Sequence, residues 1–454
     1  MRSILKNTEH WFTAFLVANL VMGTSSVLIP LKLDLVLSKG PSQLGILSTL
    51  ASAAAVLGSL IWGRLSDAAH RRKAFVVLSS LMIGVAHLGL AFSKTFLGIA
   101  LHNTLLSFFW IANASVAVLL VIERQEDSAW EASISALNLF GAVGWLLGLI
   151  AGGSCIGLAL RLLSGSGGIQ ALLVALSALG FLSAGLGAWL IPATTPIFTE
   201  RRFRGVVIAV GNLLVEAWKF NPLHLYHRFS LRRLPTLSRE TRLFLAASGL
   251  AFTGIGFFGV PLALLLSQRL GFPPRLVFFS YVMLHSGIVL AYPLALHRIR
   301  QRGNRRVQLG ALGGRIILFA VGSGALWFLP DLPWIVVGLF LLAVGLTWAY
   351  FQLSGVALAA RLAKPENRGL ALGTYNAVAG ASTMIAGVCS GYLAQYAGHH
   401  YSYLAATVLL LCAVVVLWRL PDPSIKQAKE GSEVGFPLDE SVASRSQGGC
   451  NEST

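Results

Sequence analysis

Apolar runs of about 20 residues alternate with short polar loops along most of this chain. Six such runs fall between residues 11 and 191, and six more fall between residues 242 and 419. A helix of about 20 apolar residues crosses about 30 Å of hydrocarbon, so the pattern predicts twelve transmembrane helices. The predicted helices cover residues 11–37, 43–66, 74–92, 96–122, 131–160, 171–191, 242–268, 275–297, 307–329, 332–361, 366–396 and 400–419.

The polar stretches outside these helices divide the chain. Within the basic stretch between the two sets of helices, residues 206–218 place apolar side chains on one side of a segment too short to span, which indicates an interfacial amphipathic helix. The end of the chain is rich in Ser, Gly, Glu and Lys and is expected to be disordered. We therefore expect a bundle of six helices over 1–191, a cytoplasmic basic linker over 192–241, a second bundle over 242–420 and a disordered cytoplasmic tail over 421–454.

Composition and charge support a polytopic membrane protein. Of the 454 residues, 55% are hydrophobic and only 12% are charged, whereas soluble domains carry about 25% charged residues. The net charge of +17 does not indicate nucleic-acid binding, because the basic residues fall in alternate loops rather than on one face. With the N-terminus inside, 28 of the 35 Lys and Arg residues lie on the inner side and six on the outer side. This bias predicts an integral protein of the cell (plasma) membrane with both termini in the cytoplasm.

Signatures of catalysis and of metal or cofactor binding are absent from the sequence. It contains no G-x-S-x-G, no H-E-x-x-H and no P-loop pattern, and its four cysteines lack the spacing of a metal site. We therefore expect neither an enzyme nor a bound metal or cofactor.

The two sets of helices repeat each other. At an offset of 238 residues, Trp110 falls on Trp348, Asn138 falls on Asn376, and Gly153 falls on Gly391. Three matches at one offset argue for duplication of a six-helix unit, and parallel repeats of this kind occur in transporters.

The loop between the second and third predicted helices carries the most distinctive motif, Gly63-x-Leu65-x-Asp67-x-x-x-Arg71-Arg72. Asp67 lies at the edge of the hydrocarbon, where a carboxylate is costly unless it has a fixed partner. The motif resembles the loop between helices two and three of the major facilitator superfamily, although Ala68 and His70 replace a base and a glycine of the family pattern.

This resemblance implies an inner gate. In the family the acid caps the start of helix 11 and pairs with basic residues, and Glu123 is well placed to pair with Arg71. The stretch Pro365-Glu366-Asn367-Arg368-Gly369 is similar to the family's helix 11 start and would supply that positive helix end. The alternative is a solvated hairpin whose basic residues only set the topology.

Glycines recur every four residues in the fifth predicted helix, at Gly144, Gly148 and Gly152. Small residues at this spacing allow close helix packing in lipid. The run is similar to the antiporter motif of superfamily exporters, with Leu149 in place of the family's proline. The alternative is that the glycines serve helix packing alone.

The resemblance also implies that helices 1, 4, 7 and 10 surround a cavity, whose lining would be aromatic and neutral polar without fixed charge at mid-depth. Such a lining suits a neutral or amphiphilic organic solute. The residues expected to contact it are Asn19, Trp110, Asn113, Trp348, Tyr350 and Gln352, with Asn138 and Asn376 at the seam between the halves.

Proton coupling usually needs a titratable group within the membrane, but no carboxylate lies near mid-bilayer in the predicted helices. The candidates are His285 in the middle of the eighth helix, His102 near the outer end of the fourth, and Asp34, two residues from Lys32. Each has an ordinary alternative, a packing histidine or an interfacial acid.

Together these features predict an all-α membrane protein of twelve transmembrane helices in two pseudo-symmetric six-helix bundles, the major facilitator fold. We expect a monomer in the lipid bilayer that acts as a secondary active transporter of a small-molecule solute by alternating access, with export favoured. Solute uptake, facilitated diffusion and a non-transporting membrane sensor are the alternatives.

Overall fold

The computed structural model of the chain describes residues 9–69, 72–124, 130–163, 166–192, 237–329, 331–363 and 368–420. Within these ranges every regular element is helical, and twelve helices are long and apolar enough to cross a membrane. The fold class expected from the hydropathy pattern is therefore confirmed. The interfacial helix expected over 206–218 and the tail lie outside the described residues.

The N-terminal half contains six long helices whose ends agree closely with the apolar runs. They are α2 (Phe12–Leu35), α3 (Pro41–Ala69), α4 (Arg72–Phe92), α5 (Phe96–Arg124), α6 (Trp130–Leu162) and α7 (Ser166–Leu190).

The C-terminal half has one interruption that hydropathy did not predict. The span expected over 242–268 is present as residues 239–269, but it is not one continuous α-helix. The chain bends near Pro261, which has no N–H to donate, and continues partly as a π-helix. The elements are α10 (Arg239–Gly259), α11 (Leu262–Leu264), the π-helix η2 (Leu265–Arg269), α12 (Pro274–Arg302), α13 (Asn304–Phe328), α14 (Trp334–Leu362), α15 (Arg368–Tyr396) and α16 (His399–Trp418).

Glycines bring helices of the same half into backbone contact. A Cβ at Gly148 of α6 would collide with the backbone oxygen of Leu20 in α2, and one at Gly287 of α12 would collide with the backbone oxygen of Leu342 in α14. In lipid, where helix association depends on close packing, such contacts hold a bundle together.

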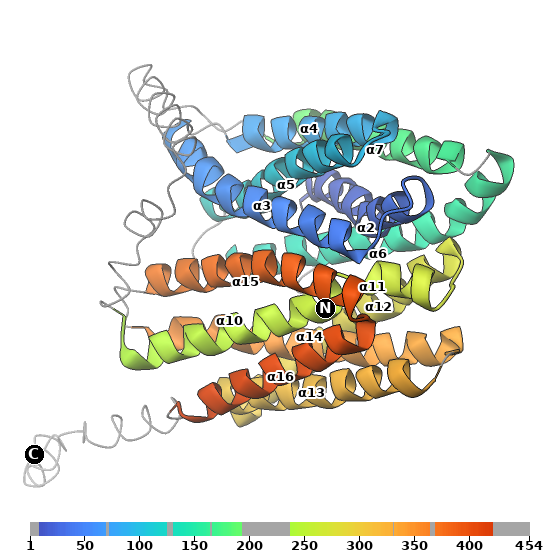
Figure 1. Cartoon of the computed structure of the whole chain (residues 1–454). Helices are drawn as coiled ribbons and strands as arrows, with labels where there is room; N and C mark the ends of the chain where they lie inside the picture. The colour runs from blue at the N-terminus through green and yellow to red at the C-terminus, as the bar shows by residue number, and fades with distance from the viewer. Residues whose placement is uncertain are drawn as a thin grey trace, which may run out of the picture.

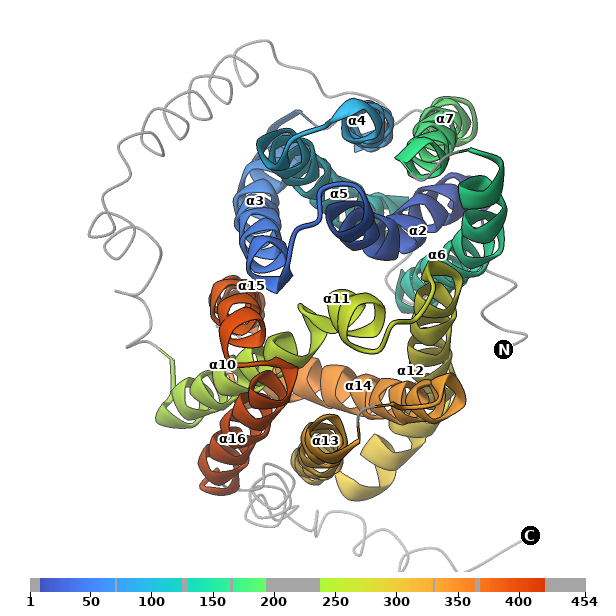
Figure 2. The same ribbon diagram turned by 45° about the vertical axis from the view of Figure 1, so that its right-hand side comes forward.

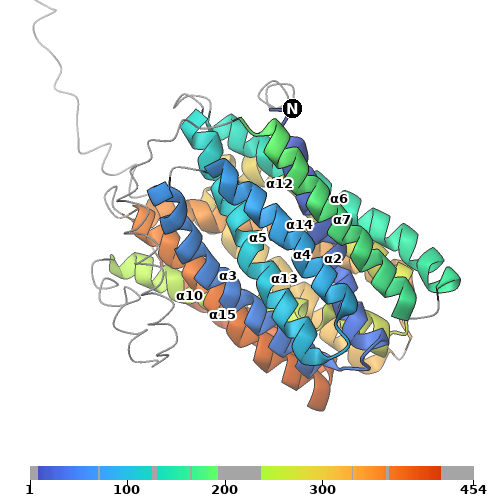
Figure 3. The same cartoon turned by 90° about the horizontal axis from the view of Figure 1, so that it is seen from above.

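The two halves meet along a seam made by α3 beside α15 and by α6 beside α12 (Figures 2 and 3). In the first pair, Gly45 packs against the backbone of Gly387 and Gly391. In the second pair, the ring of Phe278 covers Gly152 and Gly153. In the α3–α15 pair glycine therefore meets glycine, whereas in the α6–α12 pair the glycines leave room for an aromatic ring.

Hydrogen bonds join the halves near one end of the seam. The Gln268 amide donates to Asp34 Oδ1 at 2.8 Å and to the Lys39 carbonyl at 3.1 Å, and the Ser42 hydroxyl donates to Gln395 Oε1 at 2.8 Å. We call the end that carries these five residues the latched end. Away from it, α3 and α15 diverge (Figure 1).

Candidate functional site

Four aromatic side chains form a continuous cluster across the seam. The Trp110 ring (α5) meets the Trp145 ring (α6) edge-on at 6.4 Å, and Trp145 stacks on the His285 ring (α12) at 5.9 Å with 22° between planes. The Tyr281 ring, one turn before His285, is 6.5 Å from it. We call these four residues the aromatic bridge, because Trp145 belongs to one half and His285 to the other.

The aromatic bridge lies near the middle of the length of the helices. His285 is the twelfth residue of α12, so it stands about 17 Å along the helix axis from the first residue at 1.5 Å per residue. That distance is about half the 30 Å thickness of the hydrocarbon core. A molecule bound against these rings would lie near the middle of the membrane.

The hydrogen bonding of the aromatic bridge leaves polar atoms for a ligand. His285 Nδ1 lies 2.9 Å from the Tyr281 carbonyl, and because a carbonyl can only accept, Nδ1 carries the proton. His285 Nε2 is then the atom that can accept a hydrogen bond or a second proton. Trp145 Nε1 is buried with no partner among the described residues, a costly arrangement that a ligand acceptor would relieve.

A buried cation, Arg315 of α13, stands behind Trp348 of α14. Arg315 of α13 is only 2% exposed, and its guanidinium carbon lies 5.3 Å from the centre of the Trp348 ring. Its Nη2 donates to the Val344 carbonyl at 3.3 Å, while Nε has no partner among the described residues. The aromatic faces of Trp348 and Phe319 supply the cation–π contacts that partly replace water.

The family follows from a comparison with known sequences. The model of the Major Facilitator Superfamily matches residues 11–352 and 312–447. The chain belongs to the major facilitator superfamily. Together with the structural relatives, this match identifies a transporter rather than an enzyme.

The relatives in this superfamily resemble the chain in fold more than in sequence. The uncharacterized MFS-type transporter YhhS of Salmonella typhi and of Salmonella enteritidis PT4 is 30% identical over 151 residues, which is 32% of this chain and 35% of that protein. The match therefore spans about a third of the curated relative.

Among solved structures, the nucleoside transporter NupG has a TM-score of 0.69 at 13% identity, covering 92% of this chain and 98% of the other. A D-xylose–proton symporter has a TM-score of 0.67 at 14% identity, covering 91% and 98%. At these identities the likeness establishes the fold alone.

Two of the residues expected to contact the solute are buried within the N-terminal half. Asn113 is 1% exposed and donates to the Ser80 hydroxyl at 2.9 Å. Asn19 is 6% exposed, and its amide donates to the Phe15 carbonyl at 2.8 Å and lies against Gly141 of α6. Both amides take part in packing between helices of this half.

The remaining expected residues are partly accessible. Tyr350 and Gln352 follow Trp348 along α14 and are half-buried, and Gln352 Oε1 has no partner among the described residues. Asn138 of α6 and Asn376 of α15 are exposed. The latter pair lies toward the end where the halves diverge, well away from the latched end.

The coupling candidates fall in three different surroundings. Asp34 and Lys32 point to different sides of α2, because residues two apart do not face each other on a helix. It accepts the bond from Gln268 at the latched end, whereas Lys32 donates to the last carbonyls of α4, those of Leu90 and Ala91. His102 packs within the N-terminal half, with Nδ1 2.8 Å from the Gly98 carbonyl.

Of the family gate motif, only part can be located. Gly63 and Asp67 belong to α3, Glu123 to α5, and Arg72 is the buried first residue of α4. The surroundings of Gly63, the side chains of Asp67 and Glu123, and all of Arg71 lie outside the described part of the structure. The gate therefore stays a prediction from the motif.

Sequence reasoning missed Trp145 and Tyr281. Trp145 follows Gly144, which faces α2, and a step of one residue on a helix turns a side chain by about 100°. The signal available in the sequence was a large aromatic residue directly after a glycine that packs against α2. Such a residue points away from α2, in this case toward α12. Tyr281 stands one turn before the only histidine in the middle of α12, which is the corresponding signal on the other half.

Proposed function

We propose that this protein is a secondary transporter that moves a small neutral or amphiphilic organic solute by alternating access, in the direction of export and in exchange for protons. The observation that carries the proposal is the Trp145–His285 stack, because it joins the halves at mid-membrane depth. A solute between these rings would interact with both halves at once.

The chemistry of the aromatic bridge favours such a solute. Its rings offer broad apolar faces, and Trp145 Nε1 and His285 Nε2 offer one polar contact each. The guanidinium of Arg315 lies against the rings of Trp348 and Phe319 and donates to a backbone carbonyl. Arg315 is only 2% exposed, so it does not present an open cationic site. A sugar or a phosphate would need several hydrogen bonds or paired cations, which favours an amphiphile.

Alternating access is supported by the difference between the two ends of the seam. The latched end is joined by hydrogen bonds and by glycine contacts, whereas α3 and α15 diverge toward the other end (Figure 1). From the distribution of Lys and Arg we infer that the latched end faces outward and that both termini are cytoplasmic. The structure would then be the inward-open state of a monomeric transporter, and the Asp67 motif would close the opposite end.

Proton exchange is assigned to His285. A proton on Nε2 would turn a neutral ring stacked on Trp145 into a cation over an aromatic face. The strength of the contact between the halves therefore depends on the charge of His285. Solute bound against the same rings would compete with the proton on His285 Nε2. This arrangement links protonation to the seam without a membrane-embedded carboxylate.

The test is transport by purified protein in liposomes, with a panel of fluorescent lipophilic dyes and with or without a pH gradient. We expect His285→Ala to lose gradient-driven accumulation while downhill exchange survives. His297→Ala is the matched control, because His297 is exposed near the end of the same helix and should leave accumulation unchanged.

Undiminished accumulation in His285→Ala would make His285 a packing residue and leave Asp34 or His102 as the next candidates. Transport that never responds to pH would exclude proton coupling. Movement of dye in the same direction as protons, rather than against them, would replace export by uptake.

A further inference from the structure

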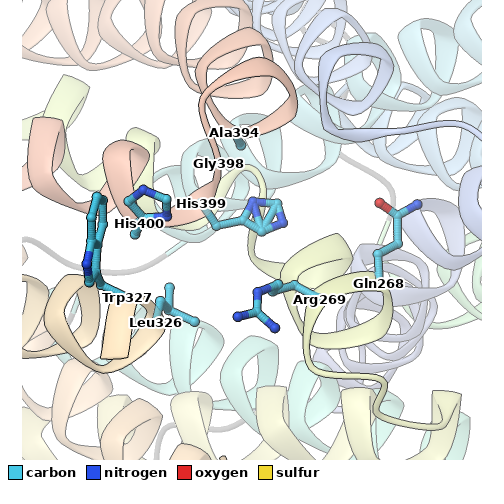
Figure 4. Close-up of a pocket in the computed structure, with 8 residues that line it drawn as sticks. All are labelled: Gln268, Arg269, Leu326, Trp327, Ala394, Gly398, His399 and His400. Carbon is cyan, nitrogen blue, oxygen red and sulfur yellow. The ribbon is translucent and has the colours of Figure 1, made fainter. Parts of the chain in front are cut away.

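A cavity lies at the latched end, within the C-terminal half and apart from the aromatic bridge. Its volume is about 540 Å³. It lies between the end of η2, the ends of α13 and α15 and the start of α16 (Figure 4). The residues that line it are Gln268, Arg269, Leu326, Trp327, Ala394, Gly398, His399 and His400.

The lining of this cavity is basic. One arginine and two histidines contribute to it, and none of its eight residues is acidic. The side chains of Arg269 and His399 extend toward each other across the cavity (Figure 4). Because arginine carries only hydrogen-bond donors, a bound cation would be repelled and a ligand with acceptor oxygens would be favoured.

Two imidazole nitrogens at the cavity are buried without a partner. His399 is only 9% exposed, and neither its Nδ1 nor His400 Nε2 has a hydrogen-bond partner among the described residues. A buried polar atom left in this way costs free energy. A ligand oxygen would satisfy His399 from the same side that Arg269 approaches.

The local backbone holds these histidines in place. Gly398, at a positive φ of 106°, turns the chain into α16, so that His399 and His400 occupy the first turn of a 20-residue helix. The Ser323 hydroxyl donates to the His400 carbonyl at 2.9 Å, and the Trp327 ring meets the His400 ring edge-on at 4.5 Å. The positive end of α16 adds to the basic character of the cavity.

Exposed aromatic side chains surround the cavity. Trp327, in its wall, is 57% exposed, and the nearby Tyr396 and Tyr401 are 78% and 40% exposed. Trp and Tyr at the ends of membrane helices typically lie at the interface between hydrocarbon and water. An anion could therefore enter from the headgroup layer or from the water above it.

We propose that this cavity is a phosphate-binding site, in which Arg269 and His399 hold the oxygens of a phosphate group. Guanidinium and imidazole donors arriving from two elements suit a group that accepts hydrogen bonds in several directions. The phosphate can belong to an anionic lipid headgroup, as in the basic pockets of other membrane proteins, or to a soluble compound. The site is independent of the solute carried and of the direction of transport.

The experiment measures binding of two probes to the full-length protein. The first is phosphatidylglycerol in nanodiscs of phosphatidylcholine, detected by native mass spectrometry as retained lipid, and the second is inorganic phosphate, detected as a shift in thermal stability in detergent. We expect at least one probe to bind wild type and to bind Arg269→Gln and His399→Gln at least tenfold more weakly. Arg275→Gln is the control, because Arg275 is an exposed cation only six residues away and should bind as wild type does.

Each outcome decides the proposal or its source. If the variants retain less phosphatidylglycerol than wild type and inorganic phosphate does not shift the thermal stability of wild type, the ligand is a lipid headgroup. If wild type binds both probes, the site accepts a phosphate of either source. If His399→Gln fails to fold, exposed Arg269 still provides the decisive variant. No binding of either probe, or equal loss in Arg269→Gln and Arg275→Gln, would overturn the proposal.

Discussion

Replacing Gly391 by alanine should shift the transporter away from the state with the latched end closed. A Cβ at Gly391 would lie 2.6 Å from the Pro41 carbonyl oxygen and 2.9 Å from the Gly45 Cα. Both atoms belong to the backbone of α3, so no side chain can rotate away. The helices would have to separate by about 0.8 Å to reach the 3.4 Å of an ordinary contact.

The size of the effect follows from the cost of overpacking, which is about 1–3 kcal/mol for one inserted methyl group. In the proposed outward-open state the two halves would separate at this point, so the cost would fall on one conformation only. A difference of 1–3 kcal/mol corresponds to about a 5- to 150-fold change in a conformational equilibrium. Gly373→Ala is the matched control, because Gly373 lies on the same helix with nothing within 4 Å, and both variants gain similar helix propensity.

The assay is the distance between spin labels on the two halves, in a protein whose native cysteines are replaced by serine. Leu162→Cys in α6 and Tyr396→Cys in α15 are suitable sites, because these side chains are 72% and 78% exposed. Gly391→Ala should populate a longer distance at the latched end and Gly373→Ala should not. Identical distance distributions in the two variants would refute the idea that glycine contacts hold this end closed.

Three further predictions concern other parts of the molecule. Lys32→Met should lower the free energy of unfolding by about 1.5–3 kcal/mol, measured by thermal unfolding in detergent, because two carbonyls of α4 lose their donor. The control is Lys94→Met, which removes an exposed lysine and should have little effect. Equal losses in the two variants would contradict a stabilising role for Lys32. Asp67→Asn should slow transport in liposomes strongly without reducing membrane insertion, and equal rates would leave the motif only a topological role. Solute should quench tryptophan fluorescence less in Trp110→Phe and in Trp348→Phe than in wild type, and unchanged quenching in both would mean that this repeat pair records ancestry rather than binding.

The long-range pattern of the sequence predicted the helices well, because the thickness of the bilayer dictates the length of each apolar run. It failed at Pro261, where hydropathy continues but the hydrogen-bond ladder does not, and the chain forms α11 and η2. A hydropathy profile reports the apolar character of side chains and carries no information about backbone hydrogen bonds. For the same reason it does not distinguish Pro261 from Pro30, which lies inside the continuous helix α2.

The candidate site was only partly predictable, because sequence shows which residues share a helix but not which face meets another helix. Trp110 and His285 were identified, and they lie within one cluster, but the residue that connects them, Trp145, was seen only as part of a glycine run. Asn113 has the chemistry of a binding residue, yet its partner Ser80 is on a neighbouring helix of the same half. Such pairings depend on helix rotation, which a single sequence does not encode locally.

The most direct test of a solute site at the aromatic bridge is protein-dependent dye transport in liposomes by wild type, Trp145→Ala and Trp189→Ala. Trp145 joins the halves through His285, whereas Trp189 of α7 is 80% exposed on the outside of the bundle. We predict that wild type and Trp189→Ala move at least one lipophilic dye faster than empty liposomes do, and that Trp145→Ala loses most of this transport. Equal transport by Trp145→Ala and wild type would contradict the account.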